Sequence, residues 1–404
     1  MALKMTDTVS SPLAELHRNV GAETLAYDTT EIVSTFGEPQ AEYAAIRKAA
    51  GLLDLPQRGL IELTGDDRHA FLNNLISNQL VDKATKTPLQ PGQWVYAFLL
   101  NLKGRVVLDL NVIETGGRTL LELDGRLVPM LVSLLDRYVF AERVKIRSLA
   151  GEAYEIALHG PGAADLLTAE GMTLKLSPGQ CGEGTLGGAP IIVWRDDPCG
   201  VPGLHLIVPN DRAADLWQHL LARHGNEISL GKRSLRPIGW AAFNATRVEA
   251  GRLLFGVDFE LAPPSMPGKQ ATAQADAEPR PVGVLPAETT LLDRAVSFTK
   301  GCYLGQEVVA RMHARSQVAR QLVGLRVDDD ALPIAGAQVF DDQQNVVGVV
   351  TSSTMSPILS DAAIALAMVR KPMFDVGRRL LVAAEGAVRG AVVTPLPFLQ
   401  KGDE

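Results

Sequence analysis

The stretch Phe298-Thr299-Lys300-Gly301-Cys302-Tyr303-Leu304-Gly305-Gln306-Glu307 places one thiol between a lysine and a predicted helix start. Gly301 and Gly305 permit backbone conformations that a side chain would block, and residues 306–315 have the pattern of a short helix. A cysteine beside an ammonium and near a helix N-terminus tends to have a lowered thiol pKa, because both stabilise the thiolate. The alternative is a tight turn in which Cys302 is only a small buried hydrophobe.

The composition is that of a soluble globular protein with more than one domain. The chain has 404 residues, of which 46% are hydrophobic and 21% are charged. A formal net charge of -7 without a basic tract predicts no sequence-independent nucleic-acid binding. No signal peptide and no apolar run long enough to span a bilayer is recognisable, so we expect a cytoplasmic protein without a membrane partner.

The three cysteines, Cys181, Cys199 and Cys302, are widely spaced and form no C-x-x-C pair. This pattern disfavours a disulfide framework, and it predicts no metal or cluster site held by cysteines of this chain alone. One thiol cannot hold a 4Fe–4S cluster, so any cluster contact of Cys302 would be transient or shared with a partner.

The first segment, residues 1–149, has the pattern of an α+β layer. Helices are predicted after Gly65 and over residues 127–138, and strands at 59–64, 94–100, 106–113 and 119–123. The stretch Asn101-Leu102-Lys103-Gly104 joins two of these strands as a hairpin-type loop. Helices mixed with adjacent antiparallel strands favour an α+β fold over a doubly wound parallel sheet.

The second segment, residues 150–316, has a similar order of elements, although no residue-level repeat is visible. We therefore predict two similar, ferredoxin-like α/β units. Residues 261–288 are rich in Pro and Ala without periodicity, which predicts a mobile loop. The third segment, residues 317–404, predicts a small C-terminal β-barrel. Its predicted strands are 321–327, 337–340, 346–351, 364–369 and 380–383.

The stretch around Cys302 resembles the signature of the YgfZ-type folate-binding proteins, which are relatives of the glycine cleavage T protein. Gly348-Val349-Val350-Thr351-Ser352, with Ser356-Pro357 and Ile364-Ala365-Leu366-Ala367, resembles the C-terminal barrel of the T-protein family. The resemblance runs from about Leu13 to Phe398. It implies a three-lobed architecture, in which two α/β units form a folate-binding domain, and it implies tetrahydrofolate as the cofactor.

Two polar residues on neighbouring predicted strands are assigned to folate by this resemblance. Gly104-Arg105-Val106-Val107-Leu108-Asp109-Leu110 resembles the T-protein segment whose aspartate lies beside the reactive nitrogens of tetrahydrofolate. Tyr96 matches a tyrosine of the same pocket, and a phenol beside a carboxylate suits a flat, hydrogen-bonding pterin. From the alternation of the strand alone, Asp109 could equally face solvent.

Arg247-Val248-Glu249-Ala250-Gly251 resembles the R-x-E-x-G element of the family. This implies that Arg247 and Glu249 line the folate cleft, and Gln306, beside the thiol turn, is a further expected contact. Without the family context, a surface ion pair between Arg247 and Glu249 is the simpler interpretation.

Several positions depart from the T-protein pattern. Leu108 stands where T proteins carry a second acid, and Cys302 and Gln306 replace the T-protein residues at their turn. His205 stands where T proteins have a glutamate that anchors the pterin ring. A neutral histidine cannot accept two hydrogen bonds as a carboxylate can, so these departures disfavour a complete transfer site.

The resemblance implies two candidate functions. The first is a folate-binding accessory protein that supports iron–sulfur cluster assembly or repair, and thereby tRNA-modifying and other iron–sulfur enzymes. Its partners would be assembly proteins or client enzymes, with Cys302 as the working thiol and Lys300 as its electrostatic partner. The second is a tetrahydrofolate-dependent aminomethyl- or methyltransferase, in which Asp109 holds or deprotonates the folate nitrogen. A scaffold without a ligand would leave the thiol turn unexplained.

The first function makes one geometric prediction. Cys302 should be partly exposed, and it should open towards a cleft formed by Tyr96, Asp109 and Arg247. A structural cysteine would instead be buried among apolar side chains, which raises the thiol pKa.

Overall fold

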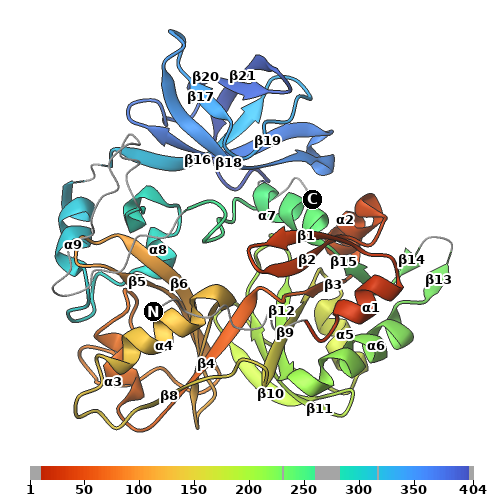
Figure 1. Cartoon of the computed structure of the whole chain (residues 1–404), viewed down its shortest axis with the longest axis vertical. Helices are drawn as coiled ribbons and strands as arrows, with labels where there is room; N and C mark the ends of the chain where they lie inside the picture. Colours follow the sequence, from red (N-terminus) through yellow and green to blue (C-terminus); the bar gives the residue numbers. More distant parts are fainter. Residues whose placement is uncertain (1–10, 230–231, 260–282, 316–317, 400–404) are drawn as a thin grey trace, which may run out of the picture. The chain divides into compact units, whose positions relative to one another are not determined.

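The computed structural model describes residues 11–229, 232–259, 283–315 and 318–399. The chain forms two compact units, which interleave along the sequence (Figure 1). The first unit comprises Met1–Asp66, Gln90–Trp94 and Val112–Thr246, and the second comprises Asp67–Leu89, Val95–Asn111 and Arg247–Glu404. The predicted division at 149/150 and 316/317 follows chain order and stays a prediction.

A six-stranded sheet of order β10-β11-β12-β9-β3-β15 organises the first unit. Its short strand β3 pairs antiparallel with β9 and parallel with β15. β3 comes from the predicted first segment and β9 from the predicted second, so the sheet combines strands of both. The bounds are β3 Gly51–Asp54, β9 Ala153–His159, β10 Cys181–Leu186, β11 Ala189–Arg195, β12 Gly203–Pro209 and β15 Arg236–Ile238.

The two faces of this sheet differ in chemistry because side chains alternate along each strand. Ile156 and Leu158 of β9 share one buried apolar cluster with Leu166 of α5 (Ala163–Ala169) and Leu216 of α6 (Ala213–His224). Residues at alternate positions of β9, among them Glu155, lie on the opposite face. The sheet thus carries polar side chains on the face away from α5 and α6.

Shorter elements complete the first unit. β7 (Thr119–Asp124), β4 (Arg58–Thr64) and β8 (Lys145–Ser148) are consecutive antiparallel neighbours. β1 (Glu23–Tyr27) and β2 (Thr30–Thr35) form a separate hairpin, as do β13 (Glu227–Ser229) and β14 (Lys232–Arg233). The remaining elements are α1 Ala14–Asn19, α2 Pro39–Lys48, η1 Gly125–Leu127, α4 Val128–Asp136, η2 Asn210–Arg212 and α7 Trp240–Glu249, whose last residues belong to the second unit.

The second unit joins the predicted hairpin to the thiol turn. β5 (Gln93–Leu100) and β6 (Val106–Glu114) are neighbouring strands, and most residues of each belong to this unit. Its helices are α3 Arg68–Asn73, η3 Pro286–Glu288, α8 Leu292–Ala295 and α9 Gln306–Arg315. The helix predicted over residues 306–315 is therefore confirmed. Most of the loop predicted at 261–288 lies outside the described residues.

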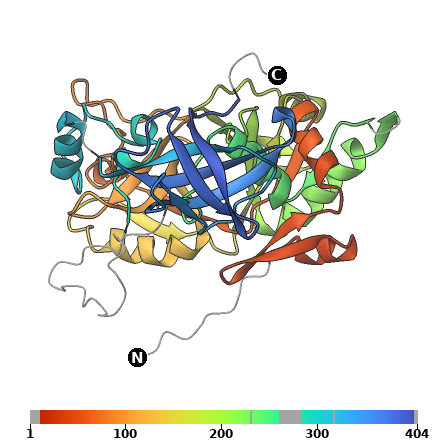
Figure 2. The ribbon, with the colours of Figure 1, turned by 90° about the horizontal axis from the view of Figure 1, so that it is seen from above.

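The C-terminal part of the second unit is a closed six-stranded barrel of order β16-β19-β18-β17-β20-β21 (Figure 2). The bounds are β16 Arg320–Val327, β17 Gln338–Phe340, β18 Val346–Ser356, β19 Ala362–Arg370, β20 Arg379–Ala384 and β21 Ala387–Thr394, with η4 Pro357–Leu359 after β18. A core of valine, leucine and alanine side chains fills it. The predicted α+β fold with a C-terminal barrel is confirmed.

One barrel strand, β21, was absent from the predicted strand ranges. It follows β20 through Glu385 and Gly386, which both have positive φ, 50° and 77°. Two such residues in succession form the tight turn that matches the twist of a hairpin. The Glu-Gly pair is the signal that would have located this strand.

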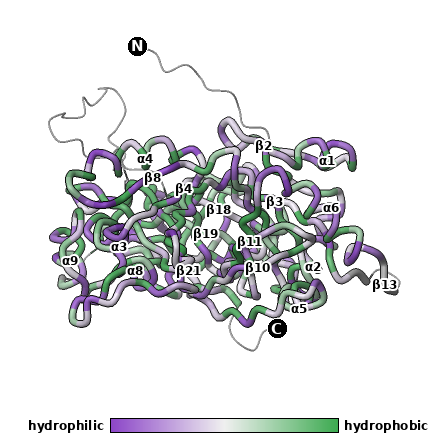
Figure 3. Tube along the Cα trace, turned by 90° about the horizontal axis from the view of Figure 1, so that it is seen from below, coloured by the Kyte–Doolittle hydropathy of each residue, from purple (hydrophilic) through white to green (hydrophobic). Residues whose placement is uncertain are grey.

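Among the described helices, none is at once long and apolar enough to cross a bilayer. The trace coloured by hydropathy shows hydrophilic and hydrophobic residues interspersed along the helices (Figure 3).

Candidate functional site

The buried ammonium of Lys300 anchors the start of the thiol turn, residues 300–305. Lys300 is 3% exposed. Its Nζ donates to three backbone carbonyl oxygens, those of Asn73 at 2.5 Å, Ile76 at 2.6 Å and Asn78 at 2.9 Å. Burial lowers the pKa of Lys300 to about 7, while the three acceptors favour its charged form. The predicted pairing of Lys300 with Cys302 is not supported, because the ammonium directs its three donors to these carbonyl oxygens.

Cys302 is exposed, in contrast to Cys181 and Cys199, which are buried. The next residue, Tyr303, is buried with its ring centre 4.9 Å from Nζ of Lys300, and burial raises the pKa of its hydroxyl to about 12. Two buried side chains therefore hold the turn on either side of the thiol. The alternative of a buried structural cysteine is wrong, and the predicted exposure is confirmed.

Gly305 fixes the end of the thiol turn against the β5–β6 turn. Its φ is +77°, and a Cβ there would lie 2.5 Å from the carbonyl oxygen of Asn101 and 3.0 Å from the Cα of Gly104. A Cβ on Gly301 would meet no atom within 4 Å. The expected need for glycine is therefore confirmed at Gly305 and is not supported at Gly301.

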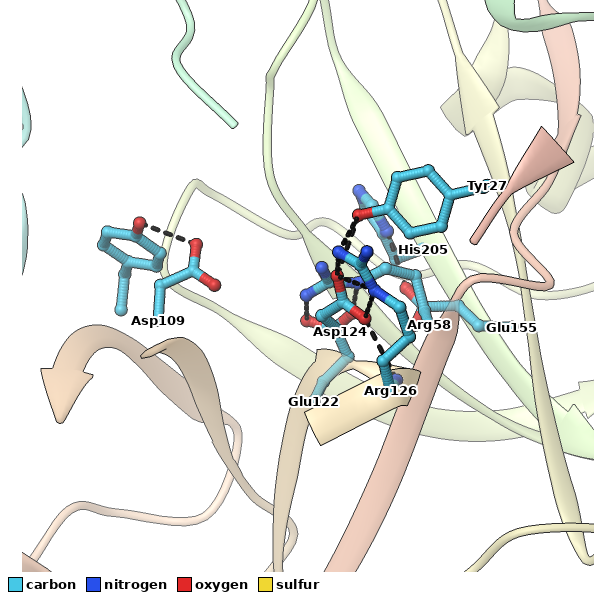
Figure 4. Close-up of polar contacts among 9 residues, drawn as sticks. Tyr27, Arg58, Asp109, Glu122, Asp124, Arg126, Glu155 and His205 are labelled. Carbon is cyan, nitrogen blue, oxygen red and sulfur yellow. Dashed lines mark hydrogen bonds and ion pairs between the residues drawn. The ribbon is translucent and has the colours of Figure 1, made fainter. Parts of the chain in front are cut away.

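Tyr96 on β5 and Asp109 on β6 form a buried hydrogen-bonded pair. The Tyr96 hydroxyl donates to Asp109 Oδ2 at 2.8 Å (Figure 4), and the two residues are only 8% and 9% exposed. The alternative that Asp109 faces solvent is wrong. Arg294 of α8 places its guanidinium carbon 4.8 Å from the centre of the Tyr96 ring. Arg294 was not predicted, because α8 is only four residues long and has no recognisable helical periodicity.

Arg247 and Glu249 are fully buried and make structural contacts within the second unit. Arg247 donates to Asp258 Oδ2 at 2.7 Å and to Ser352 Oγ of the barrel at 2.6 Å. Glu249 accepts a hydrogen bond from the barrel residue Ser356 at 2.5 Å. Arg247 and Glu249 were expected to line a cleft or, alternatively, to form a surface ion pair. Both expectations are corrected, because a side chain without exposed area can neither line a cleft nor form an ion pair at the surface. Their contact with folate is not supported.

Gln306 is the first residue of α9 and is partly buried. Its backbone N–H donates to the carbonyl oxygen of Tyr303 at 3.3 Å, so its position is set by the thiol turn. The predicted contact of the Gln306 side chain with folate stays a prediction.

On the polar face of the six-stranded sheet, the partly buried His205 of β12 and the buried Glu155 of β9 form a second pair. His205 Nδ1 and Glu155 Oε1 are 2.7 Å apart (Figure 4). Burial, and then the charge of Glu122, raise the pKa of Glu155 to about 7. Burial opposes the charge on His205, but the hydrogen bond and charge of Glu155 outweigh it and raise the His205 pKa. From the sequence we expected a neutral His205 without a carboxylate. This expectation is corrected, because the carboxylate of Glu155 lies beside the ring.

Two further side chains of this face carry buried nitrogen atoms that find no hydrogen-bond partner in the described part of the chain. Both ring nitrogens of His159 and Nε1 of Trp194 are buried without a partner among the described residues. The Trp194 ring stacks on His205 with 4.1 Å between ring centres. Burial, followed by the charge of His205, lowers the pKa of His159 to about 3. Buried polar atoms without hydrogen bonds lower the free energy of unfolding, so this polar face destabilises the folded protein.

Two ion pairs of the same unit involve β7, one with β4 and one with η1 (Figure 4). Arg58 pairs with Glu122, and Arg126 donates to Asp124 Oδ2 at 2.6 Å. The Tyr27 hydroxyl donates to the same Asp124 oxygen at 2.8 Å. Burial and then the charge of Asp124 raise the Tyr27 pKa well above its usual value. Within the ranges that the structure describes, no group of three histidine, cysteine or acidic side chains is placed to hold a metal ion.

Comparison with known proteins gives a consistent answer over the whole chain. The GCVT N-terminal domain matches residues 13–263, and the glycine cleavage T-protein C-terminal barrel domain matches residues 320–400. The chain is 29% identical over 400 residues to a probable aminomethyltransferase of Natronomonas pharaonis, covering 96% of this chain and 98% of that protein. It is 27% identical over 395 residues to an aminomethyltransferase of Geobacillus kaustophilus, covering 97% and 98%.

The crystal structure of the glycine cleavage system aminomethyltransferase T from Bartonella henselae has the same fold. The TM-score is 0.80 at 24% identity, with 97% of this chain and 98% of that chain covered. The predicted T-protein-like architecture is thereby confirmed. With more than half of its length matched by the N-terminal domain of the family, the chain belongs to the glycine cleavage T-protein family.

Proposed function

We propose that this chain binds a reduced folate through Tyr96 and Asp109 and uses Cys302 as an exposed nucleophile. Tetrahydrofolate is the cofactor of the T-protein family, and a buried phenol–carboxylate pair offers hydrogen bonds to a flat polar ring. The activity is that of a YgfZ-type accessory protein, which supports iron–sulfur cluster assembly or repair and thereby tRNA-modifying and other iron–sulfur enzymes.

The observation that carries this proposal is the construction of the thiol turn. Lys300 and Tyr303 are buried and Gly305 is close-packed, while Cys302 between them is exposed. A turn held at three points costs conformational entropy, and its exposed residue gains a fixed position in return. A thiol presented in this way suits transient exchange with a partner protein, such as an assembly factor or a client enzyme.

Complementation tests the thiol role. Cells that lack this protein should lose activity of some 4Fe–4S enzymes, and wild type should restore it. Cys302→Ala should not restore it, whereas Cys181→Ala, which removes a buried thiol, is the matched control and should. Full rescue by Cys302→Ala would contradict the accessory role of the thiol.

A second candidate is a tetrahydrofolate-dependent aminomethyltransferase, and the names of the aligned relatives favour it. In this activity, Asp109 accepts a proton from, or holds, the folate nitrogen that receives the one-carbon unit. Purified protein is incubated with tetrahydrofolate and an aminomethyl-loaded carrier protein. Formation of methylenetetrahydrofolate above background, lost in Asp109→Asn, supports the transferase, and no turnover by wild type excludes it.

A further inference from the structure

The dipeptide Ser77-Asn78, which follows α3, is bonded to the strand that carries Tyr96. The Ser77 N–H donates to the carbonyl oxygen of Phe98 at 2.8 Å, and Ser77 Oγ accepts from the Phe98 N–H at 2.8 Å. Asn78 Nδ2 donates to the carbonyl oxygen of Tyr96 itself at 2.8 Å. Side-chain and backbone contacts thus join this loop to β5.

The same dipeptide is bonded to the segment that leads into the thiol turn. Asn78 Nδ2 donates to the carbonyl oxygen of Arg294 at 2.8 Å, and Ser77 Oγ donates to that of Ala295 at 2.6 Å. The carbonyl oxygen of Asn78 is one of the three that hold Nζ of Lys300. All these residues belong to the second unit.

Asn78 therefore stands between two groups that the proposed function uses. Its amide nitrogen donates to the backbone of Tyr96, whose hydroxyl bonds Asp109, and its backbone oxygen accepts from Lys300, two residues before Cys302. The second amide hydrogen reaches Arg294, whose guanidinium lies over the Tyr96 ring. The amide nitrogen of Asn78 donates to two carbonyl oxygens at once, which a hydroxyl with its single hydrogen cannot do.

We propose that Asn78 is a positioning residue that couples the Tyr96–Asp109 pair to the thiol turn, so that folate occupancy regulates the reactivity of Cys302. This rests on the proposed function for the identity of the ligand and of the thiol. A ligand that shifts Tyr96 displaces its carbonyl oxygen, and through Asn78 this displaces the anchor of Lys300. By linkage, reversible modification of Cys302 changes folate affinity by the same factor by which folate changes the equilibrium constant of that modification.

The test measures the alkylation rate of Cys302 by iodoacetamide, followed by mass spectrometry of its peptide, with and without 5-formyltetrahydrofolate. In wild type, folate should change the rate by about fivefold or more. In Asn78→Ala, folate should still bind by calorimetry, but the change in rate should fall below about twofold. Asn345→Ala is the matched control and should behave as wild type, because its side-chain amide donates to Asp341 within the same barrel turn. A full folate effect in Asn78→Ala overturns the proposal.

A second measurement needs no folate, which separates failure of the coupling from failure of the proposed function. Tyr96→Phe removes the bond to Asp109, and it should alter the alkylation rate of Cys302 in wild type but not in the Asn78→Ala background. Equal effects in both backgrounds overturn the coupling even if folate binds. The same comparison of Tyr96→Phe in two backgrounds is repeated with Asn78→Ser, which is a smaller change than Asn78→Ala. Circular dichroism verifies that each variant is folded.

Discussion

Gly305 and Gly104 hold two turns in backbone contact, since a Cβ on Gly305 would lie 3.0 Å from the Cα of Gly104. Gly104 also has positive φ, +70°, and a Cβ there would lie 2.8 Å from Cβ of Val308 in α9. The turn that follows Tyr96 and the turn that presents Cys302 are thereby packed on each other. Their two glycines lie in stretches that resemble different elements of the family, and the fold brings them together.

Gly305→Ala should destabilise the protein by about 2 kcal/mol or more, because both its φ and the carbonyl oxygen of Asn101 oppose a side chain. Gly301→Ala is the matched control in the same turn, and it should change stability by less than about 0.5 kcal/mol. Urea unfolding followed by circular dichroism measures both. Equal effects of the two substitutions would contradict the close packing at Gly305.

Lys300 should make stability depend on pH above neutrality. Burial lowers its pKa from 10.5 to about 7, so between these values the unfolded chain binds the proton that the folded chain has released. Stability therefore rises with pH in this window, with a slope of up to about 1.4 kcal/mol per pH unit. Lys300→Met should remove this component between pH 7 and 9.5, whereas Lys103→Met, at an exposed lysine, should leave it. If the free energy of unfolding depended on pH in the same way in wild type and in Lys300→Met, the lowered pKa of Lys300 would be contradicted.

His159 should lower stability at acid pH. Its pKa is lowered from 6.5 to about 3 by burial, so the unfolded chain takes up a proton that the folded chain does not. Stability then falls as pH drops from 6.5 towards 3, by about 1.4 kcal/mol per pH unit from this group. His159→Leu should therefore gain stability relative to wild type as the pH is lowered from 7.5 to 5. Thermal melts across this range test it, and a pH-independent difference refutes it.

Arg247 should matter for stability and not for folate affinity. Arg247→Met leaves the carboxylate of Asp258 buried without its cation, which should cost about 3–5 kcal/mol. The double variant Arg247→Met/Asp258→Asn removes both charges and should recover part of this loss. Calorimetric titration with folate should give the same Kd for the folded double variant as for wild type. A large loss of folate affinity in a double variant that is as stable as wild type would show that Arg247 contributes to the ligand site.

The parts of this fold that depend on local patterns were predictable. Alternation located five barrel strands, and the glycine pattern around Cys302 located the start of α9. Tyr96 and Asp109 were placed on consecutive strands joined by a short turn, whereas their assignment to one pocket came from the resemblance to the T-protein family. Each of these inferences needs only neighbours in sequence, or two strands of one hairpin.

The parts that depend on distant residues could not be read in this way. Lys300 was assigned to Cys302, its neighbour in sequence, but it binds carbonyl oxygens such as that of Asn73, 227 residues away. Glu155 was missed because it reaches His205 only through the pairing of β9 with β12. Arg247 was predicted to line the folate cleft, but it is buried against Ser352, which lies 105 residues further on. Tertiary pairing, rather than propensity, decides each case.

The barrel begins and ends on neighbouring strands, because β16 pairs directly with β21. Closeness of the two ends of a domain favours circular permutation. New termini could be opened in the Asp341–Asn345 turn, with the original ends of the barrel joined by a short linker. In such a variant, the order of the barrel strands along the chain would change, while their arrangement in the barrel would stay the same.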